Sequence, residues 1–241
     1  MTDDMPRGGP GAAWWDRLYE TDRPEYLDRA DTAGRRRRVL RGLARLERLA
    51  LAHRTFGTLV LDGLRDVPQP RFLELGAGDG GLTRWVLDRH PAARATVSDV
   101  APDLVEALRA GPLGRHARAT VARLDATAID APDGSYDLAV FTQSLHHLPP
   151  RGAADVLREG TRVARRLLVI DLWRHPACLA AVPAAFLCGG PAQAHDAVVS
   201  LRKAYSPAAL RHLAGVCGAP VALRTRFLPP LYLAAVATRR A

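Results

Sequence analysis

Residues 71–87, RFLELGAGDGGLTRWVL, decide the fold because they join an apolar strand, a glycine-rich turn and the start of a helix. Phe72, Leu73 and Leu75 cluster instead of alternating strictly, which predicts a strand buried on both faces. Glycine in the turn removes the side chains that would keep a ligand away from the backbone. The helix that begins near Leu82 points its unpaired N–H groups at the same place. The stretch therefore predicts a ligand-binding turn at the end of a buried strand.

Two acidic residues accompany this turn in the sequence. Glu74 precedes the first glycine, Gly76, and Asp99 ends the next candidate strand. In α/β folds an acid at the tip of the second strand accepts hydrogen bonds from the ribose hydroxyls of a nucleoside. The turn has one residue between Gly78 and Gly80, where the dinucleotide-binding pattern G-x-G-x-x-G has two. The sequence therefore favours a nucleoside ligand over a nicotinamide dinucleotide.

Apolar strands alternate with helical segments along the chain. We expect helices that begin at Asp31, Pro102 and Ser206, and another over 56–64. After the opening strand we expect strands over 95–98, 119–123, 136–141, 166–170, 221–226 and 231–237. This alternation predicts a parallel sheet that binds ligands at the carboxyl ends of its strands. The length of 241 residues suits one domain, and Pro229-Pro230 between the last two strands is compatible with an antiparallel hairpin.

Three segments carry a family resemblance: ELGAGDG at 74–80, VSDVAPDLVEAL at 97–108 and LDATAIDAPDGSYDLAVFTQSLHHL at 124–148. In this order they resemble the motif series of class I S-adenosylmethionine-dependent methyltransferases, over about residues 70–172. The resemblance implies an α/β fold with a Rossmann-like, doubly wound, seven-stranded and mostly parallel sheet that ends in an antiparallel hairpin. Residues 1–67 are then an N-terminal helical extension or lid. Residues 68–241 form the S-adenosylmethionine-binding methyltransferase domain, with a substrate-cover insertion at 173–204.

The resemblance also implies S-adenosyl-L-methionine as the cofactor, S-adenosyl-L-homocysteine as its product, and no metal. The glycine turn would pass beneath the methionine part, and Glu74 would hold the turn or a water at the amino group. Asp99 would bind the ribose, Val100 would lie against adenine, and Asp125 would accept from its amine. The implied cofactor-binding residues are Glu74, Gly76, Ala77, Gly78, Gly80, Asp99, Val100, Asp125, Ala126, Phe141 and Thr142. The alternative for Asp99 and Asp125 is the capping of turns or helices.

Two neighbouring histidines follow the fourth predicted strand, in the sequence QSLHHL at 143–148. In the resembling family this loop lies next to the reactive methyl group. A phenol with a pKa of about 10 costs about 4 kcal/mol to ionise at pH 7, and a histidine with a pKa of about 6.5 can take its proton. His146 is the first candidate for this base and His147 is the second. The alternative is a structural histidine that fixes the loop.

The acceptor is expected to be a small, largely apolar natural product of phenolic or polyketide type. Residues 39–57, VLRGLARLERLALAHRTFG, resemble the N-terminal region of a bacterial subgroup linked with polyketide and phenolic-lipid pathways, which implies secondary metabolism such as antibiotic biosynthesis. The apolar stretch 177–188 suits such an acceptor, and the aromatic group at 14–19 would pack onto the domain or close as a lid. We expect O-methylation. The alternatives are C-methylation and a non-methylating cyclase or decarboxylase on the same fold.

Charge and cysteine content narrow the partners and the compartment. The net charge is +9, but all 34 basic residues except Lys203 are arginines, they are scattered, and aromatic residues make up only 6%. This pattern disfavours a nucleic-acid partner, including the RNA of an RNA methyltransferase. Three cysteines without a C-x-x-C pair indicate neither disulfides nor structural zinc, so a cytoplasmic location is expected. The longest apolar run, 177–188, is broken by Pro183, so no membrane span is expected, and a homodimer is compatible with the sequence.

Overall fold

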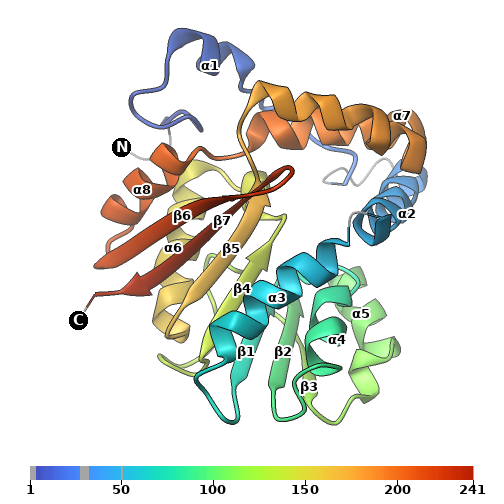
Figure 1. The fold of residues 1–241 in the computed structure, drawn as a ribbon, viewed down its shortest axis with the longest axis vertical. Coiled ribbons are helices and arrows are strands. Elements are labelled where there is room, and N and C mark those ends of the chain that lie inside the picture. Colours follow the sequence, from blue (N-terminus) through green and yellow to red (C-terminus); the bar gives the residue numbers. More distant parts are fainter. Residues whose placement is uncertain (1–3, 28–32, 50, 241) are drawn as a thin grey trace.

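The structure is a computed structural model that describes residues 4–27, 33–49 and 51–240. Its centre is a seven-stranded sheet with the strand order β3-β2-β1-β4-β5-β7-β6 (Figure 1). The strands are β1 (Arg71–Leu75), β2 (Arg94–Asp99), β3 (Ala119–Arg123), β4 (Leu138–Thr142), β5 (Leu167–Leu172), β6 (Val221–Leu228) and β7 (Tyr232–Arg239). β1 to β5 run parallel, whereas β7 runs antiparallel to both β5 and β6. The expected Rossmann-like sheet with a closing antiparallel hairpin is confirmed.

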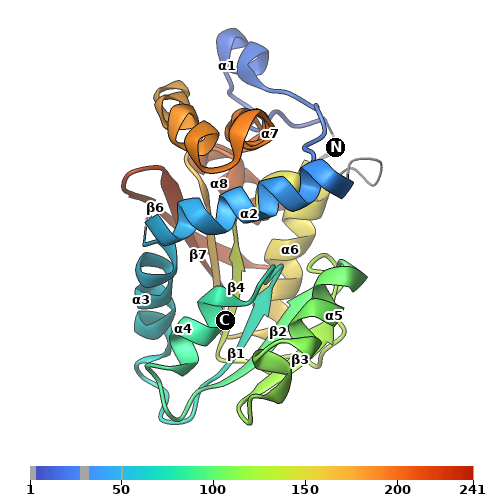
Figure 2. The same cartoon turned by 90° about the vertical axis from the view of Figure 1, so that its right-hand side faces the viewer.

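Helices cover both faces of the sheet (Figure 2). They are α1 (Trp14–Tyr19), α2 (Ala33–Leu49), α3 (Ala52–Leu64), α4 (Gly81–Leu87), α5 (Pro102–Ala110), α6 (Pro150–Val163), α7 (Val182–Lys203) and α8 (Pro207–Val216). Phe56, Val60 and Leu64 of α3 share one core with Phe72 and Leu138 of the sheet and with α4 and α5. A second core holds α6 and α8 against the other face. Because α3 packs in this core, it belongs to the same α/β unit as the sheet. The expected division of the chain at residue 67 stays a prediction.

Local sequence explains where two of the helices begin. Pro102 occupies the first turn of α5, where its missing N–H has no partner to lose. Ser206 caps α8, because its hydroxyl oxygen accepts from the backbone N–H of Ala209 at 3.0 Å. Both helix starts agree with the sequence prediction.

Buried arginines hold the N-terminal segment 4–27 on the domain. Arg7 donates to the carbonyl of His146 at 2.9 Å. Arg174 pairs with the carboxylate of Asp16 at 3.0 Å, and the Arg174 side chain is only 1% exposed. These contacts join residues that lie more than a hundred positions apart, so the segment crosses the domain on a defined path.

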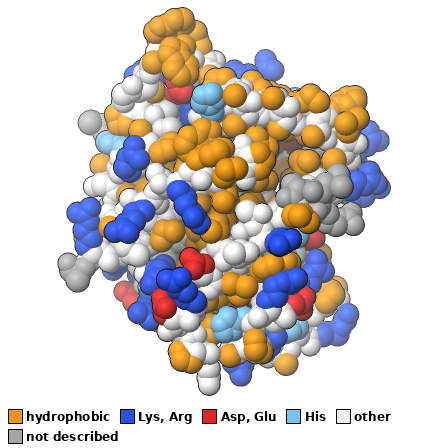
Figure 3. Space-filling view, viewed as in Figure 1, with side chains coloured by type: hydrophobic (Ala, Val, Ile, Leu, Met, Phe, Trp, Pro, Cys, Tyr) orange, Lys and Arg blue, Asp and Glu red, His pale blue; other side chains and the backbone are white. Residues whose placement is uncertain are grey.

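The apolar face of α1 does not pack as expected. Trp14, Trp15 and Leu18 are 74%, 54% and 70% exposed, so the expected packing of these three residues onto the domain is wrong. Figure 3 shows hydrophobic side chains gathered over α1 at the edge of the molecule. The reason is that Asp16 and Tyr19 face inward to Arg174, which leaves the opposite side of this six-residue helix to solvent.

The helices α2 and α7, called the cover helices below, cross in close contact above the sheet (Figure 1, Figure 2). A Cβ atom on Gly42 of α2 would lie 2.8 Å from the Cα of Gly189 in α7. α7 is kinked at Gly190, where φ is 74°, and Pro191 follows. Among the described residues, the helical segment Pro176–Lys203 has the length and apolar composition of a membrane span, with mean hydropathy 1.4. In this fold that segment packs along α2.

Candidate active site

The glycine turn after β1 is shaped by left-handed backbone conformations. Gly76 and Gly78 have φ values of 60° and 56°, a region that side chains rarely adopt. The N–H of Ala77 donates to the carbonyl of Ser98 at 2.9 Å, and the N–H of Gly78 donates to the carboxylate of Asp99 at 3.2 Å. These bonds tie the glycine turn to the end of β2. The glycine turn and Asp99 therefore lie side by side, as the sequence predicted.

Glu74 and Gly80 support this turn from behind. The buried Glu74 carboxylate accepts from the backbone N–H of Thr83 at 3.2 Å and from the Thr83 hydroxyl. This carboxylate thus ties the end of β1 to the first turn of α4, directly after the glycine turn. Gly80 was expected beneath the cofactor, but a Cβ there would lie 2.3 Å from Leu113 Cδ1, and Gly80 does not line the cavity. Its role is to let the backbone enter α4, because its φ is 70°.

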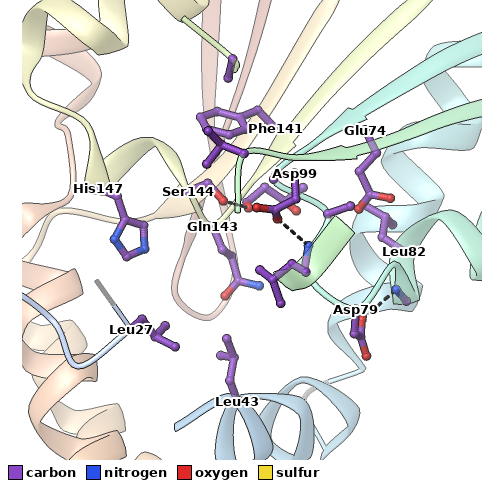
Figure 4. A pocket seen from close by; sticks show the side chains of 18 of the residues that line it. Leu27, Leu43, Glu74, Asp79, Leu82, Asp99, Phe141, Gln143, Ser144 and His147 are labelled. Carbon is purple, nitrogen blue, oxygen red and sulfur yellow. Dashed lines mark hydrogen bonds between the residues drawn. The ribbon is translucent and has the colours of Figure 1, made fainter. Parts of the chain in front are cut away.

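A cavity of about 490 Å³, the large cavity, opens between the carboxyl ends of β1, β2 and β4 and the helix α2 (Figure 4). The implied cofactor-binding residues that line it are Glu74, Gly76, Ala77, Gly78, Asp99, Val100, Asp125, Ala126, Phe141 and Thr142. The Asp99 carboxylate accepts from the N–H groups of Gly78 and Ala101, and each oxygen retains a second acceptor site. Asp125 also caps a turn, since one carboxylate oxygen accepts from the N–H of Thr127 at 2.8 Å.

A second cavity of about 100 Å³, the small cavity, adjoins the large one beneath the cover helices. Gln143, His147, Leu27 and Leu43 line both cavities. The apolar lining of the small cavity includes Val39, Leu46, Ala181, Val182, Ala185, Leu172, Leu201 and Leu231. Glu25, His146, Gln193, Asp196 and Ser200 add polar groups to this lining, so the large cavity leads from the polar loops to a space of mixed character.

Gln143 occupies the junction of the two cavities. Figure 4 shows its side chain between His147 on one side and Asp99 on the other. Its backbone is left-handed, with φ of 51°, and its N–H donates to the carbonyl of Ile170 at 2.7 Å. A non-glycine residue in this region costs about 1 kcal/mol or more and occurs often at functional sites. Apart from its place in the loop after the fourth predicted strand, nothing in the sequence pointed to Gln143.

His146 is buried, with 3% exposure, and bonds to a carboxylate. Its Nδ1 lies 2.7 Å from one oxygen of Asp171, and its backbone N–H donates to the other at 2.9 Å. Burial is the largest single influence and would raise the pKa of Asp171, but the interactions with the His146 side chain and with the backbone N–H groups of Leu172 and His146 together lower that pKa. His146, the first candidate for the base, lines the small cavity but not the large one.

His147, the second candidate, lines both cavities and stands at their junction. Its Nδ1 lies 3.9 Å from Glu25 Oε1, and the same oxygen lies 3.8 Å from His146 Nε2. Glu25 is 1% exposed. Asp196 of α7 positions the segment that follows Glu25, because its carboxylate accepts from the N–H of Tyr26 at 2.9 Å. Sequence reasoning missed Glu25 because it lies in an N-terminal segment without a recognisable motif.

Comparison with known proteins identifies the domain. Residues 72–166 match the family described as methyltransferase domain. The chain is 34% identical over 105 residues to malonyl-[acyl-carrier protein] O-methyltransferase of Geobacter sulfurreducens, covering 44% of this chain and 37% of that one. It is 30% identical over 129 residues to ubiquinone/menaquinone biosynthesis C-methyltransferase UbiE of Paracoccus denitrificans, covering 52% of this chain and 51% of that one. The chain spans about half or less of the length of these curated relatives.

Solved structures share the fold. The plantazolicin methyltransferase BpumL, in complex with a pentazolic desmethylPZN analog and S-adenosylhomocysteine, matches with a TM-score of 0.66 at 10% identity, over 90% of this chain and 93% of that one. A S-adenosylmethionine-dependent methyltransferase from Aquifex aeolicus matches with a TM-score of 0.53 at 18% identity, over 71% and 83%. The fold is that of the class I S-adenosylmethionine-dependent methyltransferases. The family match covers less than half of the chain, and the solved neighbours share the fold at 10–18% identity; their names give S-adenosylmethionine as cofactor or its product S-adenosylhomocysteine as ligand.

The large cavity fits this cofactor. A Cβ on Gly78 would meet nothing within 4 Å, so the turn presents bare backbone to open space. The Asp99 carboxylate has acceptor capacity for ribose hydroxyls, and the cavity volume of about 490 Å³ lies in the range of small-molecule sites.

Proposed function

We propose that this protein transfers a methyl group from S-adenosylmethionine to a hydroxyl of a small, largely apolar acceptor. The observation that carries the proposal is the pair of joined cavities, one at the glycine turn and one lined by both apolar and polar side chains beneath the cover helices, with His147 where they meet. Such a pair separates the donor from the acceptor and leaves one point of contact, which is what a transfer between two small molecules requires.

The residues at the glycine turn would hold the cofactor. The backbone of Gly76 and Gly78 would support its methionine part, and Asp99 would accept from the ribose hydroxyls. Val100 and Asp125 would take the adenine. When bound, S-adenosylmethionine supplies a methyl group on a positively charged sulfur, which is already activated for transfer. The protein then has to orient the acceptor and exclude water, and the cover helices with Leu27 and Leu43 close the space where this would happen.

The small cavity limits the acceptor. Its volume of about 100 Å³ is below the about 150 Å³ of an engineered apolar cavity that binds benzene, so in this form it would hold only the edge of a ring or a short arm of a larger molecule. Its apolar side chains would contact a hydrocarbon surface, and polar side chains could meet a hydroxyl: Gln143 and His147 lie at the junction with the large cavity, and Glu25, His146, Gln193, Asp196 and Ser200 lie in the wall. A phenolic ring with its hydroxyl toward the junction satisfies both features. This supports the phenolic or polyketide type of acceptor and a role in secondary metabolism.

The histidine pair would help the acceptor hydroxyl to lose its proton. Ionising a phenol at pH 7 costs about 4 kcal/mol, and His147 is the titratable side chain that lines both cavities. His146 would be a positioning residue for His147, because its ring and its backbone N–H are both held by Asp171.

C-methylation is a second candidate. A phenolate can react at carbon as well as at oxygen, and one relative is named a C-methyltransferase. The two outcomes share the cofactor site and differ in how the ring is turned in the small cavity.

The test has two steps. First, titration calorimetry and thermal shift should show binding of S-adenosylmethionine to the purified chain. Second, incubation with a panel of phenols and mass spectrometry should show S-adenosylhomocysteine together with a product heavier by one methylene, and fragmentation should place the methyl on oxygen. A methyl on carbon would favour the second candidate. A product formed without S-adenosylhomocysteine would indicate a cyclase or decarboxylase reaction instead of methyl transfer. A chain that does not bind S-adenosylmethionine would refute the proposal.

A further inference from the structure

Three groups with metal-binding atoms meet at the junction of the cavities. They are the carboxylate of Glu25, Nε2 of His146 and Nδ1 of His147, and these atoms all lie within 4.8 Å of one another. The imidazole rings lie 4.3 Å apart between centroids, at an angle of 34°. Glu25 and His146 are buried, so the cluster is not a solvated group of surface charges.

The residues around His146 hold its ring so that Nε2 can offer its lone pair to a metal ion. Nδ1 of His146 lies 2.7 Å from the buried carboxylate of Asp171, which selects the tautomer with the proton on Nδ1 and leaves Nε2 free to face Glu25. Such a carboxylate–histidine pair behind a ligand atom is the usual outer shell of histidine metal sites. The backbone N–H of His146 donates to the same carboxylate at 2.9 Å, so both the ring and the loop are held.

The spacing is close to that of a metal site. Zinc binds histidine nitrogen and carboxylate oxygen at about 2.0–2.2 Å, which places ligand atoms of a tetrahedral site about 3.3 Å apart. The Glu25 oxygen lies 3.8 Å from His146 Nε2 and 3.9 Å from His147 Nδ1. Small rotations of the Glu25 and His147 side chains would close these gaps.

We propose that Glu25, His146 and His147 form a binding site for one divalent transition-metal ion of the zinc type. Two imidazoles and one carboxylate suit zinc, iron or cobalt, whereas calcium and magnesium prefer sites built from oxygen. Three protein ligands leave a coordination position open, as in catalytic zinc sites. This departs from the expectation that the reaction site holds no metal.

The open position would face the small cavity, because all three residues line it. A hydroxyl oxygen of the acceptor could bind there, and a metal ion would lower the pKa of that hydroxyl so that water could take its proton at neutral pH. His147 would then promote ionisation as a ligand of the ion instead of taking the proton itself. This step rests on the proposed function, whereas the metal site itself does not.

The experiment measures metal binding without any acceptor. The full chain is stripped with a chelator and titrated with Zn²⁺ by calorimetry, with metal content measured after dialysis and the visible absorption of added Co²⁺ as a second readout. We expect one ion per chain and a four- or five-coordinate Co²⁺ spectrum. E25Q and H147A should weaken binding about 100-fold or more, and D171N about 10- to 100-fold. The matched control is H212A, which removes an exposed histidine on α8 and should bind as wild type.

Two results would overturn the inference. One is a stripped wild-type chain that takes up no Zn²⁺ or Co²⁺, which would make the cluster a network of ion pairs. The other is E25Q or H147A binding the ion as tightly as wild type. Melting curves of the metal-free variants verify that they are folded, and E25Q keeps the size of the side chain for this reason. Binding of S-adenosylmethionine to the same samples is measured separately, so failure of the metal site and failure of the proposed function can be distinguished.

Discussion

At the scale of single residues, Asp99 carries the cofactor proposal because its carboxylate is buried at the tip of β2 and bonded to the glycine turn. D99N should weaken S-adenosylmethionine binding about tenfold to a hundredfold, since it removes hydrogen bonds to a charged acceptor worth about 1.5–3 kcal/mol. Calorimetry measures this affinity. D137N is the matched control, because Asp137 also accepts a backbone N–H, that of Arg71, away from the cavities. Equal affinity of D99N and wild type would contradict the cofactor assignment.

The two histidines should respond differently to substitution. H147A should lower kcat about 100-fold or more and leave the cofactor affinity near that of wild type, because general acid–base groups contribute about 10²–10⁴ in rate. H146A should instead destabilise the fold by about 3–5 kcal/mol, since it leaves the buried Asp171 carboxylate without its partner. Denaturant unfolding measures the second effect, and kinetics with saturating cofactor measures the first. A folded H146A chain with wild-type stability would contradict the structural role of His146.

The residues that the sequence located lie at the carboxyl ends of predicted strands. Asp99 ends β2, Phe141 lies near the end of β4 and Gly78 comes shortly after β1, so their places in the chain already put them at one edge of a parallel sheet. Glu25 could not be found in this way, because only tertiary packing of the N-terminal segment brings it to His147. Gly80 does not line the large cavity, because the motif marks the turn but does not tell which of its glycines faces the open space.

At the scale of secondary-structure elements, the crossing of the cover helices depends on the absence of side chains at Gly42 and Gly189. G42A should cost about 1–3 kcal/mol of stability, because its Cβ would lie 2.8 Å from the Gly189 Cα and the helices would have to separate. G34A on the same helix is the control, since a Cβ there meets nothing within 4 Å. It should be neutral or stabilise by up to about 1 kcal/mol. Thermal and denaturant unfolding compare the two, and equal stability of both variants would show that the crossing tolerates separation.

The strands of the sheet were predictable and the long helix α7 was not. The expected strand 136–141 appears as 138–142, because Tyr136 makes only an isolated bridge to Ala164. Residues 173–204 contain helix-breaking residues, yet Val182–Lys203 is helical. Pro183 lies in the first turn, where proline is tolerated, and the kink at Gly190 absorbs Pro191. The positions of proline and glycine alone could not distinguish a kinked helix from a segment without regular secondary structure.

At the scale of the whole molecule, the N-terminal segment is the part that completes the site. It carries Leu27, which lines both cavities, and Glu25, which faces the histidines. Arg7 ties it to the histidine loop through the carbonyl of His146. The residues proposed to contact the cofactor, by contrast, all come after residue 70. Binding of the cofactor and competence toward the acceptor therefore depend on different parts of the chain.

R174A tests this separation. The Arg174 side chain is buried and pairs with Asp16 and Glu20, so its removal takes the described cation from Asp16, leaves Glu20 with Arg7 alone, and should release the segment locally. We expect faster proteolysis and faster amide hydrogen exchange in residues 4–27, a loss of turnover of about tenfold or more, and cofactor affinity close to wild type. R174K should rescue only in part, because lysine cannot make the forked contacts of a guanidinium. R54A, which removes an arginine on α3 outside the described ion pairs, is the control. If R174A lost cofactor binding and turnover together, the segment would be part of the general stability of the domain, and the division of roles between the two parts of the chain would be wrong.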